Sequence, residues 1–343
     1  MFLSGLVLGV FVCWLVVWLS PHTLFAQQSR GSILRQHDPE FLLVSPLLAA
    51  EVGTEASFPE LDPVKTAMMD VINQSESQEG VKDVSVYYRL LNSARWFEIN
   101  GTTSYAPASL LKVFVMVAFY AESENLDEPT LLQKEIRFEG SANMSADKPG
   151  EVIPHLVSGK YYSVEDVIAQ MIVYSDNDAL NTLLDNFDPS TLAAFKQIFT
   201  DLKIPSPTDQ KESSFDFLSV EQYSLIFRVL YSTTYLTPRH SQQALDLLSR
   251  AHYTSGLVAG VPKGVTVAHK FGVTTDPATR TTPAEPELHD CGIVYYPGHP
   301  YLMCVMTRGS DFASLQSVIK QLSGVAYQQT NKSCSTATKC FSK

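Results

Sequence analysis

The sequence predicts an α+β domain with a mainly antiparallel sheet of about five strands, packed by terminal helices. Strand-like runs rich in β-branched and aromatic residues occur at both ends of the region 63–327. They are "VSVYYRLL" and "ARWFEIN" early, then "GVTVAHKFGV", "LHDCGIVYYP" and "YLMCVMTRG" late. The long stretch between them, from Pro107 to about Arg250, has a mostly helical pattern. We therefore expect a sheet assembled from distant parts of the chain, with an all-helical lobe inserted between its strands.

Two further helical patterns lie outside the strands. "DPVKTAMMDVINQSES" precedes the first strand, with Pro63 suited to a first helical turn, and "SDFASLQSVIKQLSGVAY" follows the last strand. We expect these two terminal helices to cover one face of the sheet and the helical lobe to lie on the other face.

The composition is that of a folded, acidic chain. With 45% hydrophobic residues in 343, the chain can bury a full core. Its 36 acidic and 25 basic residues give a formal charge of -11, whereas nucleic-acid binding depends on neutralising phosphates with Lys and Arg. Nucleic acid is therefore not an expected partner.

The N-terminal segment is apolar from residue 2 to residue 19 and carries no charge. About 18 apolar residues are enough for a short membrane-spanning helix, so we favour an uncleaved membrane anchor. Cleavage near Ala26 would instead give a secreted protein, and an apolar core helix is the third interpretation. Both of the first two interpretations place the rest of the chain outside the cytoplasm. The expected organisation is an anchor or signal segment over 1–26, a linker over 27–62, a folded domain over 63–327 and a polar tail over 328–343.

Two of the five cysteines lie in neighbouring strand-like runs. Cys291 and Cys304 flank "YPGHPY", and a hairpin that turns near Gly298 would place them opposite each other. The pattern is compatible with a cross-strand disulfide and equally with two reduced core cysteines. The cysteines show no metal-ligand spacing, so no metal site is expected.

The stretch "PASLLKVFVMVAFY" places Ser109 and Lys112 at the start of an apolar helix. Residues at i and i+3 share a helix face, and a buried lysine with a lowered pKa can take the proton of a serine hydroxyl. The same SxxK spacing occurs at Ser145 and Ser317, but only Ser109 begins a helix that is apolar nearly all round. Ser109 is therefore the candidate nucleophile.

Two shorter motifs follow in the chain. In "MIVYSDNDALNTLLD", Ser175 and Asn177 belong to a polar turn between apolar helical runs, where a helix N-cap is the simpler interpretation. In "VAHKFGV", Lys270 lies near the end of a strand and Gly272 permits close approach of another backbone. Each motif by itself is weak evidence for a site.

In the order SxxK, SDN and KxG, the three motifs resemble those of the serine β-lactamase and penicillin-binding superfamily, most closely the class A β-lactamases. The resemblance covers about residues 63 to 327. It includes "RWFEIN", "MIVYSDN", "AGVPKGVTVAHKFG" and the ends "YYPG" and "TRG" of the last two strands. This resemblance implies the β-lactamase fold, a serine hydrolase mechanism and no metal or organic cofactor.

The resemblance also implies a role for each motif residue. Ser109 would be the acylated nucleophile, Lys112 a proton acceptor, and Ser175 the donor of a proton to the leaving nitrogen. Asn177 would bind the substrate amide, while Lys270 would attract the substrate carboxylate.

The resemblance also assigns two backbone groups and the strand position between them. The backbone N–H groups of Ser109 and Val273 would form the oxyanion hole, with Phe271 and Gly272 lining the substrate site.

The chain departs from the class A pattern in two places. The glutamate that activates water for deacylation, in an ExxLN setting after SDN, is missing, and Glu212 in "DQKESSFDF" is a candidate base whose alternative is a solvated loop acid. Phe271 and Val273 occupy positions where the family often has hydroxyl residues that bind the substrate carboxylate.

The expected function is a membrane-anchored or exported serine hydrolase that forms a Ser109 acyl-enzyme on β-lactams or related amides. One alternative is a penicillin-binding, DD-peptidase-like protein that deacylates slowly and acts on peptidoglycan peptides. The other is a non-catalytic cell-wall binding module.

Overall fold

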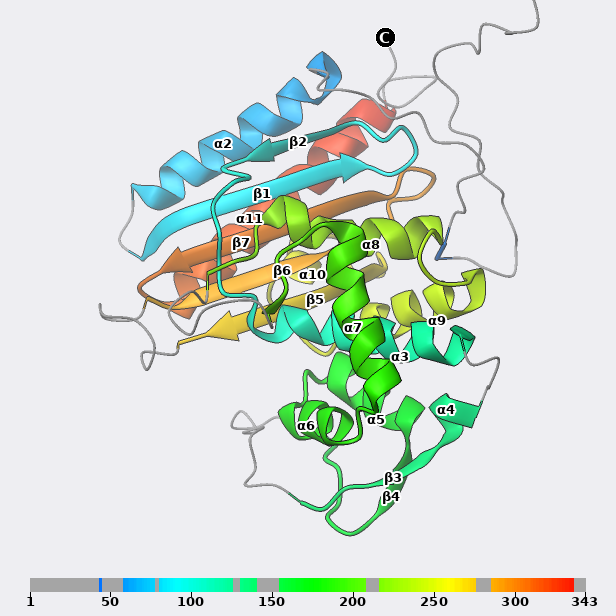
Figure 1. Cartoon of the computed structure of the whole chain (residues 1–343). Coiled ribbons are helices and arrows are strands. Elements are labelled where there is room, and N and C mark those ends of the chain that lie inside the picture. The colour runs from blue at the N-terminus through cyan, green and yellow to red at the C-terminus, as the bar shows by residue number, and fades with distance from the viewer. Residues whose placement is uncertain are drawn as a thin grey trace, which may run out of the picture.

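The fold is centred on a five-stranded sheet with the order β2-β1-β7-β6-β5 (Figure 1). The computed structural model describes residues 43–44, 58–77, 80–125, 130–140, 154–207, 216–275 and 285–335. The strands of the large sheet are β1 (Val81–Leu90), β2 (Trp96–Ile99), β5 (Val267–Thr274), β6 (Glu287–Val294) and β7 (Tyr301–Gly309). All neighbouring strands are antiparallel, which confirms the predicted sheet.

Helices form a layer on each face of this sheet. Helices α2 (Asp62–Glu76) and α11 (Phe312–Ser335) lie along one face, and the helical lobe covers the other (Figure 1). The lobe contains α3 (Lys112–Asn125), α4 (Thr130–Gln133), α5 (Val164–Val173), α6 (Asn177–Asp185), α7 (Pro189–Leu202), α8 (Val220–Ser232) and α9 (Pro238–Ser249). The shorter elements are the 3-10 turns η1 (Pro59–Leu61) and η2 (Ala108–Leu111), the helix α10 (Leu257–Gly260), and a two-stranded sheet of β3 (Glu135–Arg137) and β4 (Tyr161–Ser163). The predicted layering is confirmed.

The chain end differs from the expected polar tail that begins at residue 328. Helix α11 continues to Ser335. Thr330 is fully buried there, and its hydroxyl donates to the carbonyl of Ala326 at 2.8 Å and is hydrogen-bonded to the hydroxyl of Tyr88 at 3.2 Å. The polar residues of this segment therefore include a buried hydroxyl that ties the last turns of the helix to β1.

Two residues of the predicted linker pack against the domain. The backbone N–H of Leu43 donates to Oε1 of Gln242 at 2.7 Å, and the hydroxyl of Tyr295 donates to the carbonyl of Leu43 at 2.9 Å. Val44 is buried in the core on the lobe side. The segment before the domain is therefore attached to it near α9.

The predicted membrane anchor, residues 2–19, lies outside the residues that the structure describes. Across the ranges that are described, no helix has both the length and the apolar character needed to cross a membrane.

The core consists of two apolar clusters, one on each face of the sheet. Side chains of a strand alternate between these clusters, so the strands are buried on both faces, and every residue of β6 is buried. On the lobe side, α3 is buried along its first three turns from Lys112 to Tyr120. This confirms the prediction of a central helix after Ser109.

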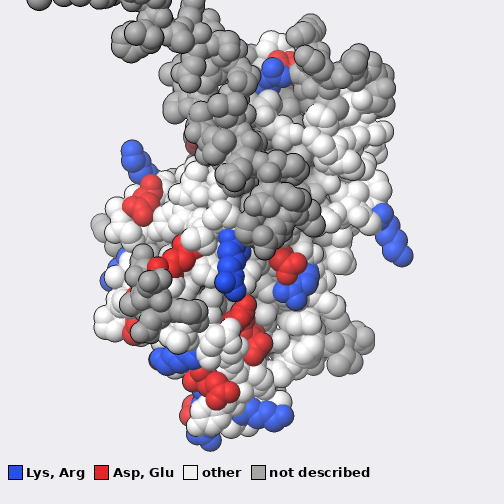
Figure 2. All heavy atoms as spheres, turned by 90° about the vertical axis from the view of Figure 1, so that its right-hand side faces the viewer, with Lys and Arg blue, Asp and Glu red and all other residues white. Residues whose placement is uncertain are grey.

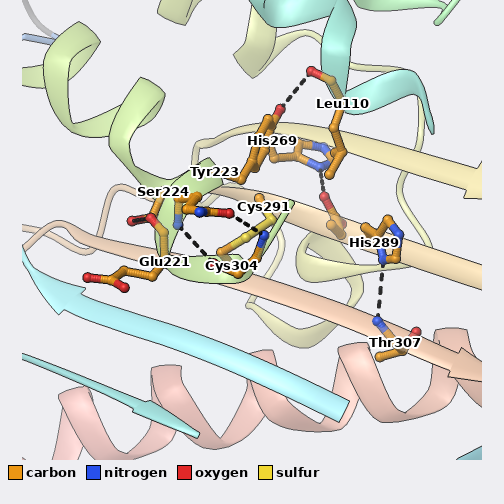
Figure 3. The surroundings of a disulfide bond; sticks show 12 residues. Leu110, Glu221, Tyr223, Ser224, His269, His289, Cys291, Cys304 and Thr307 are labelled. Atoms are coloured by element: carbon orange, nitrogen blue, oxygen red, sulfur yellow. Dashed lines mark hydrogen bonds and ion pairs between the residues drawn. A yellow bond between two sulfur atoms is a disulfide. The ribbon is translucent and has the colours of Figure 1, made fainter. Parts of the chain in front are cut away.

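Cys291 and Cys304 form a disulfide, which confirms the first of the two alternatives for these residues. They are direct partners across β6 and β7, and both are fully buried. The disulfide lies on the lobe face of the sheet beside Glu221 and Ser224 of α8 (Figure 3).

Charged side chains are interspersed on the face drawn in Figure 2, where basic and acidic groups lie next to each other over the lower half. Ion pairs of the lobe also join opposite charges, such as Arg137 with Glu139 at 3.0 Å. The coloured part of this face therefore carries charges of both signs.

Candidate active site

The candidate nucleophile Ser109 lies in the 3-10 turn η2, directly before α3. Its side chain is half-buried, and its neighbour Ala108 has a left-handed backbone with φ of 47°. A non-glycine residue in this region costs about 1–3 kcal/mol, and such residues occur preferentially at active sites. The turn is therefore held in a shape that the local sequence does not favour.

Lys112 is the first residue of α3, and its ammonium group faces the turn that contains Ser175 and Asn177. Its Nζ donates to Oδ1 of Asn177 at 2.6 Å, to the carbonyl of Ser175 at 2.5 Å and to the hydroxyl of Ser175 at 3.3 Å. The side chain is only 1% exposed. Burial lowers the pKa of Lys112 to about 8, against the opposing charge of Asp176.

The SDN turn contains both a helix cap, Asp176, and the two candidate site residues, Ser175 and Asn177. Asp176 is the N-cap of α6, because its carboxylate accepts the backbone N–H groups of Asp178 and Ala179. Ser175, with φ of 57°, and Asn177 are thereby left to direct their side chains toward Lys112. The cap interpretation is therefore confirmed for Asp176, and the site roles of Ser175 and Asn177 stay predictions.

Lys270 of β5 completes a hydrogen-bond network around Ser175. Its Nζ donates to the hydroxyl of Ser175 at 2.8 Å and to the carbonyl of Phe271 at 2.9 Å. Burial, and after it the positive charge of Lys112, hold the pKa of Lys270 well below its ordinary range, against the opposing charge of Asp290. One serine hydroxyl thus lies between two lysines that both hold their protons weakly.

Strand β5 forms one edge of the sheet, and at Gly272 its lobe face lies against the turn of Ser109. A Cβ atom at Gly272 would lie 3.1 Å from the carbonyl oxygen of Pro107 and 3.3 Å from the backbone nitrogen of Leu110. The absence of a side chain at Gly272 therefore allows the strand to approach the nucleophile turn this closely.

The carbonyl of Phe271 accepts a hydrogen bond from Lys270 and so points to the open edge of β5. Backbone groups of residues two apart in a strand point to the same edge, so the N–H of Val273 also faces outward. An outward-facing backbone N–H is the kind of donor that an oxyanion hole uses.

A buried pair on β6 holds the chain just before the nucleophile turn. Oε2 of Glu287 accepts the N–H of Ala106 at 3.0 Å, and Nε2 of His289 is 3.0 Å from the carbonyl of Ala106. Nδ1 of His289 accepts the N–H of Thr307 at 3.3 Å, so the proton belongs on Nε2, which donates to Ala106 (Figure 3). Both backbone polar groups of Ala106 are therefore satisfied by side chains of one strand.

Arg308 of β7 neutralises the negative charge of Glu287. Its guanidinium lies 2.7 Å from Oε1 of Glu287, 3.2 Å from Asp83 and 2.7 Å from Asp216. Burial alone would raise the pKa of Glu287, but the hydrogen bond from His289 and the charge of Arg308 outweigh it and lower the pKa to about 2. Glu287 is thus a carboxylate throughout the neutral range.

Sequence reasoning missed Glu287, His289 and Arg308. The available signal was the alternation of Glu287 and His289 in the strand "ELHDCGIV", which places two polar side chains on the lobe face of a buried sheet. A polar pair in such a position needs partners, and here the partner is the nucleophile turn.

Phe271 has no hydroxyl group to offer a substrate, and its ring stacks on the ring of Tyr253 with centroids 4.2 Å apart.

Glu212, the candidate deacylation base, lies outside the described residues. In the described segments, no three His, Cys, Asp or Glu side chains are arranged to hold a metal ion. The described hydrogen bonds join Lys112 of α3, Ser175 of the SDN turn and Lys270 of β5, and Ser109 lies in η2, three residues before Lys112. Groups of this kind can activate a hydroxyl and relay its proton.

Several solved structures have a similar fold. PBP-A matches with a TM-score of 0.62 and 21% identity, over 79% of this chain and 97% of that chain. A beta-lactamase from Sphaerobacter thermophilus matches with a TM-score of 0.61 and 19% identity, over 79% and 98%. A class A beta-lactamase from Mycobacterium abscessus matches with a TM-score of 0.60 and 19% identity, over 76% and 98%. At these identities the likeness shows a common fold.

None of the curated proteins compared with the chain matches it. A sequence model described as the beta-lactamase enzyme family matches residues 63–330, close to the predicted domain of 63–327. Because this match spans most of the chain and carries all three motifs of the site, the chain belongs to the beta-lactamase enzyme family.

Proposed function

We propose that the protein is an exported or membrane-anchored serine hydrolase of the class A β-lactamase type, acylated at Ser109 by β-lactams or related amides. The observation that carries this proposal is the shared network in which Lys112, three residues after Ser109, and Lys270 both bond to the hydroxyl of Ser175. Such a network supplies both a proton acceptor for the nucleophile and a proton donor for the leaving group.

The acylation step follows from these positions. Neutral Lys112 takes the proton of Ser109 as the serine oxygen attacks the carbonyl carbon, and the N–H groups of Ser109 and Val273 stabilise the oxyanion that forms. When the carbon–nitrogen bond breaks, the hydroxyl of Ser175 gives its proton to the leaving nitrogen. Ser175 regains a proton from Lys112, with Lys270 as its second neighbour, so protons balance over the step.

Deacylation is the step on which the two enzymatic candidates differ. The sequence contains no ExxLN segment, which favours a penicillin-binding, DD-peptidase-like protein that keeps its acyl group for longer. A solved structure of similar fold is described as the acyl-enzyme complex of a PBP-A mutant with penicillin G, which supports acylation as the common step. The role of Glu212 as a deacylation base is part of this proposal.

Labelling with a fluorescent penicillin tests the proposal and separates its alternatives. The wild type should be labelled, Ser109→Ala should not, and Ser317→Ala should be labelled normally, because Ser317 repeats the SxxK spacing on an exposed position of α11. Rapid loss of label would support a β-lactamase, and persistence a penicillin-binding protein. Absence of any Ser109-dependent label would refute both and favour the non-catalytic cell-wall binding module.

N-terminal sequencing of the mature protein tests its attachment to the membrane. We expect the chain to retain residues 2–19. A mature chain that starts at Gln27 would refute the anchor and support secretion.

A further inference from the structure

Side chains of β6 bind both backbone polar groups of Ala106, three residues before the candidate nucleophile. Oε2 of Glu287 accepts the N–H of Ala106 at 3.0 Å, and Nε2 of His289 donates to its carbonyl at 3.0 Å. All three residues are buried. Hydrogen bonds in a buried place are not readily exchanged for bonds to water, so these two side chains restrain the backbone at Ala106.

The residue that follows the nucleophile is restrained from α8. The hydroxyl of Tyr223, which is fully buried, donates to the carbonyl of Leu110 at 3.2 Å (Figure 3). The N–H of Leu110 donates to the carbonyl of Pro107 at 2.9 Å, which closes a four-residue turn around Ser109. The turn therefore lies between two restrained points, Ala106 on one side and Leu110 on the other. We refer to the three side chains that restrain these points as the turn clamp: Glu287, His289 and Tyr223.

Within the turn, the unfavourable backbone conformation is at Ala108. Its φ of 47° lies in the left-handed region, where the Cβ of an L-residue is too close to its own backbone. Pro107 cannot take over this part of the turn, because its ring keeps φ near the observed value of -66°. With its ends free, the turn would relax as Ala108 returned to negative φ. The torsions of Ala108 set where Ser109 places its backbone N–H and its hydroxyl, so this relaxation would move the candidate nucleophile.

We propose that the turn clamp positions Ser109 for attack by keeping Ala108 in its left-handed conformation. This inference rests on the proposed function, since it concerns the same acylation of Ser109. The three side chains do not have to touch the acyl donor, because each acts through the backbone at Ala106 or Leu110. A weakened clamp should therefore lower the first-order rate constant for acylation at saturating donor, while the donor concentration that gives half of the maximal rate changes little.

The rate of acylation by a fluorescent penicillin, measured at increasing donor concentration, tests this proposal. The side chain of His289→Asn ends near the position of Nδ1, so it can still accept the N–H of Thr307 but cannot reach Ala106. Its maximal rate constant should fall about tenfold or more. Tyr223→Phe removes only the hydroxyl that binds Leu110 and should also lower the maximal rate, so it serves as the test if His289→Asn does not fold. The wild-type maximal rate in either folded variant would overturn the inference.

Two controls show whether the effect is specific to the clamp. His289→Gln places an amide N–H near the position of Nε2 and should restore most of the rate. His240→Asn makes the same substitution on α9, where Nδ1 of His240 lies 2.7 Å from Oε1 of Glu124 near the C-terminal end of α3, and it should acylate at the wild-type rate. A loss of rate in His240→Asn or His289→Gln equal to that in His289→Asn would indicate a general loss of structure and overturn the inference.

Ala108→Gly tests the role of the left-handed residue. Glycine takes a positive φ without steric cost, so the turn needs less restraint. In the Ala108→Gly background, His289→Asn should therefore reduce the maximal rate several times less than it does with Ala108 present, because the two positions are coupled. An equal reduction in both backgrounds would refute the link between the clamp and Ala108. If the wild type is not labelled at Ser109 at all, the proposed function fails and this inference fails with it, whereas a labelled wild type with unaffected variants refutes the inference alone.

Discussion

The pH dependence of acylation follows directly from the environment of Lys112. The proposed mechanism requires this lysine to be neutral, and burial lowers its pKa to about 8. The neutral fraction is then about one in eleven at pH 7, one half at pH 8 and about ten in eleven at pH 9. The acylation rate should therefore rise about tenfold between pH 7 and pH 9 and then level off, until other groups titrate.

Stopped-flow measurement of the acylation rate constant over pH 6 to 10 checks this expectation. Lys112→Arg is the matched control, because a guanidinium stays protonated over this range and cannot act as the base. That variant should lose most of the rate and also the rise near pH 8. A wild-type rate that is flat or falls from pH 7 to pH 9 would show that neutral Lys112 is not the proton acceptor.

Three substitutions test how the site is held. Glu287→Ala removes the carboxylate that binds the buried N–H of Ala106 and the charge of Arg308. The free energy of unfolding, measured by chemical denaturation, should therefore fall by about 3–5 kcal/mol, and it should fall less in Glu287→Gln. Gly272→Ala puts a methyl group 3.1 Å from Pro107 and should slow acylation about tenfold or more at nearly unchanged secondary structure by circular dichroism; a normal rate would refute the close approach. Replacing Cys291 and Cys304 by alanine should cost about 3 kcal/mol of stability for a loop of this length, and no change in the melting temperature would contradict that estimate.

The sequence was sufficient for the layers of the fold, and its three motifs supplied candidate site residues whose roles stay predictions. Strand composition and turn position predicted which cysteines face each other, because cross-strand pairing follows from local pattern. The apolar surroundings of Ser109 distinguished it from Ser145 and Ser317, whose spacing is identical. These features are local, so periodicity and composition reveal them.

The remaining features depend on contacts between distant segments. The hydrogen bonds from Ala106 to Glu287 and His289 join residues more than 180 positions apart, and no local pattern indicates which residues pair in this way. The same is true of Thr330, whose buried contact with Tyr88 extends α11 beyond its expected end. The contact between the Nζ of Lys270 and the ring of Phe271, 4.3 Å from the ring centroid, was also missed, since a sequence does not show the direction of a ring.

The pairing of β1 with β7 has a consequence for how the protein reaches its folded state. Asp83 and Arg308 are paired across these strands and are 225 residues apart in the chain. Until the last strand has been synthesised, β1 has only the short β2 as a partner and exposes one hydrogen-bonding edge. Long-range pairing of this kind slows folding, and it leaves incomplete chains open to aggregation. Because β6 and β7 also carry the residues that hold the nucleophile turn, a chain truncated before Tyr301 should be both aggregation-prone and unable to form an acyl-enzyme.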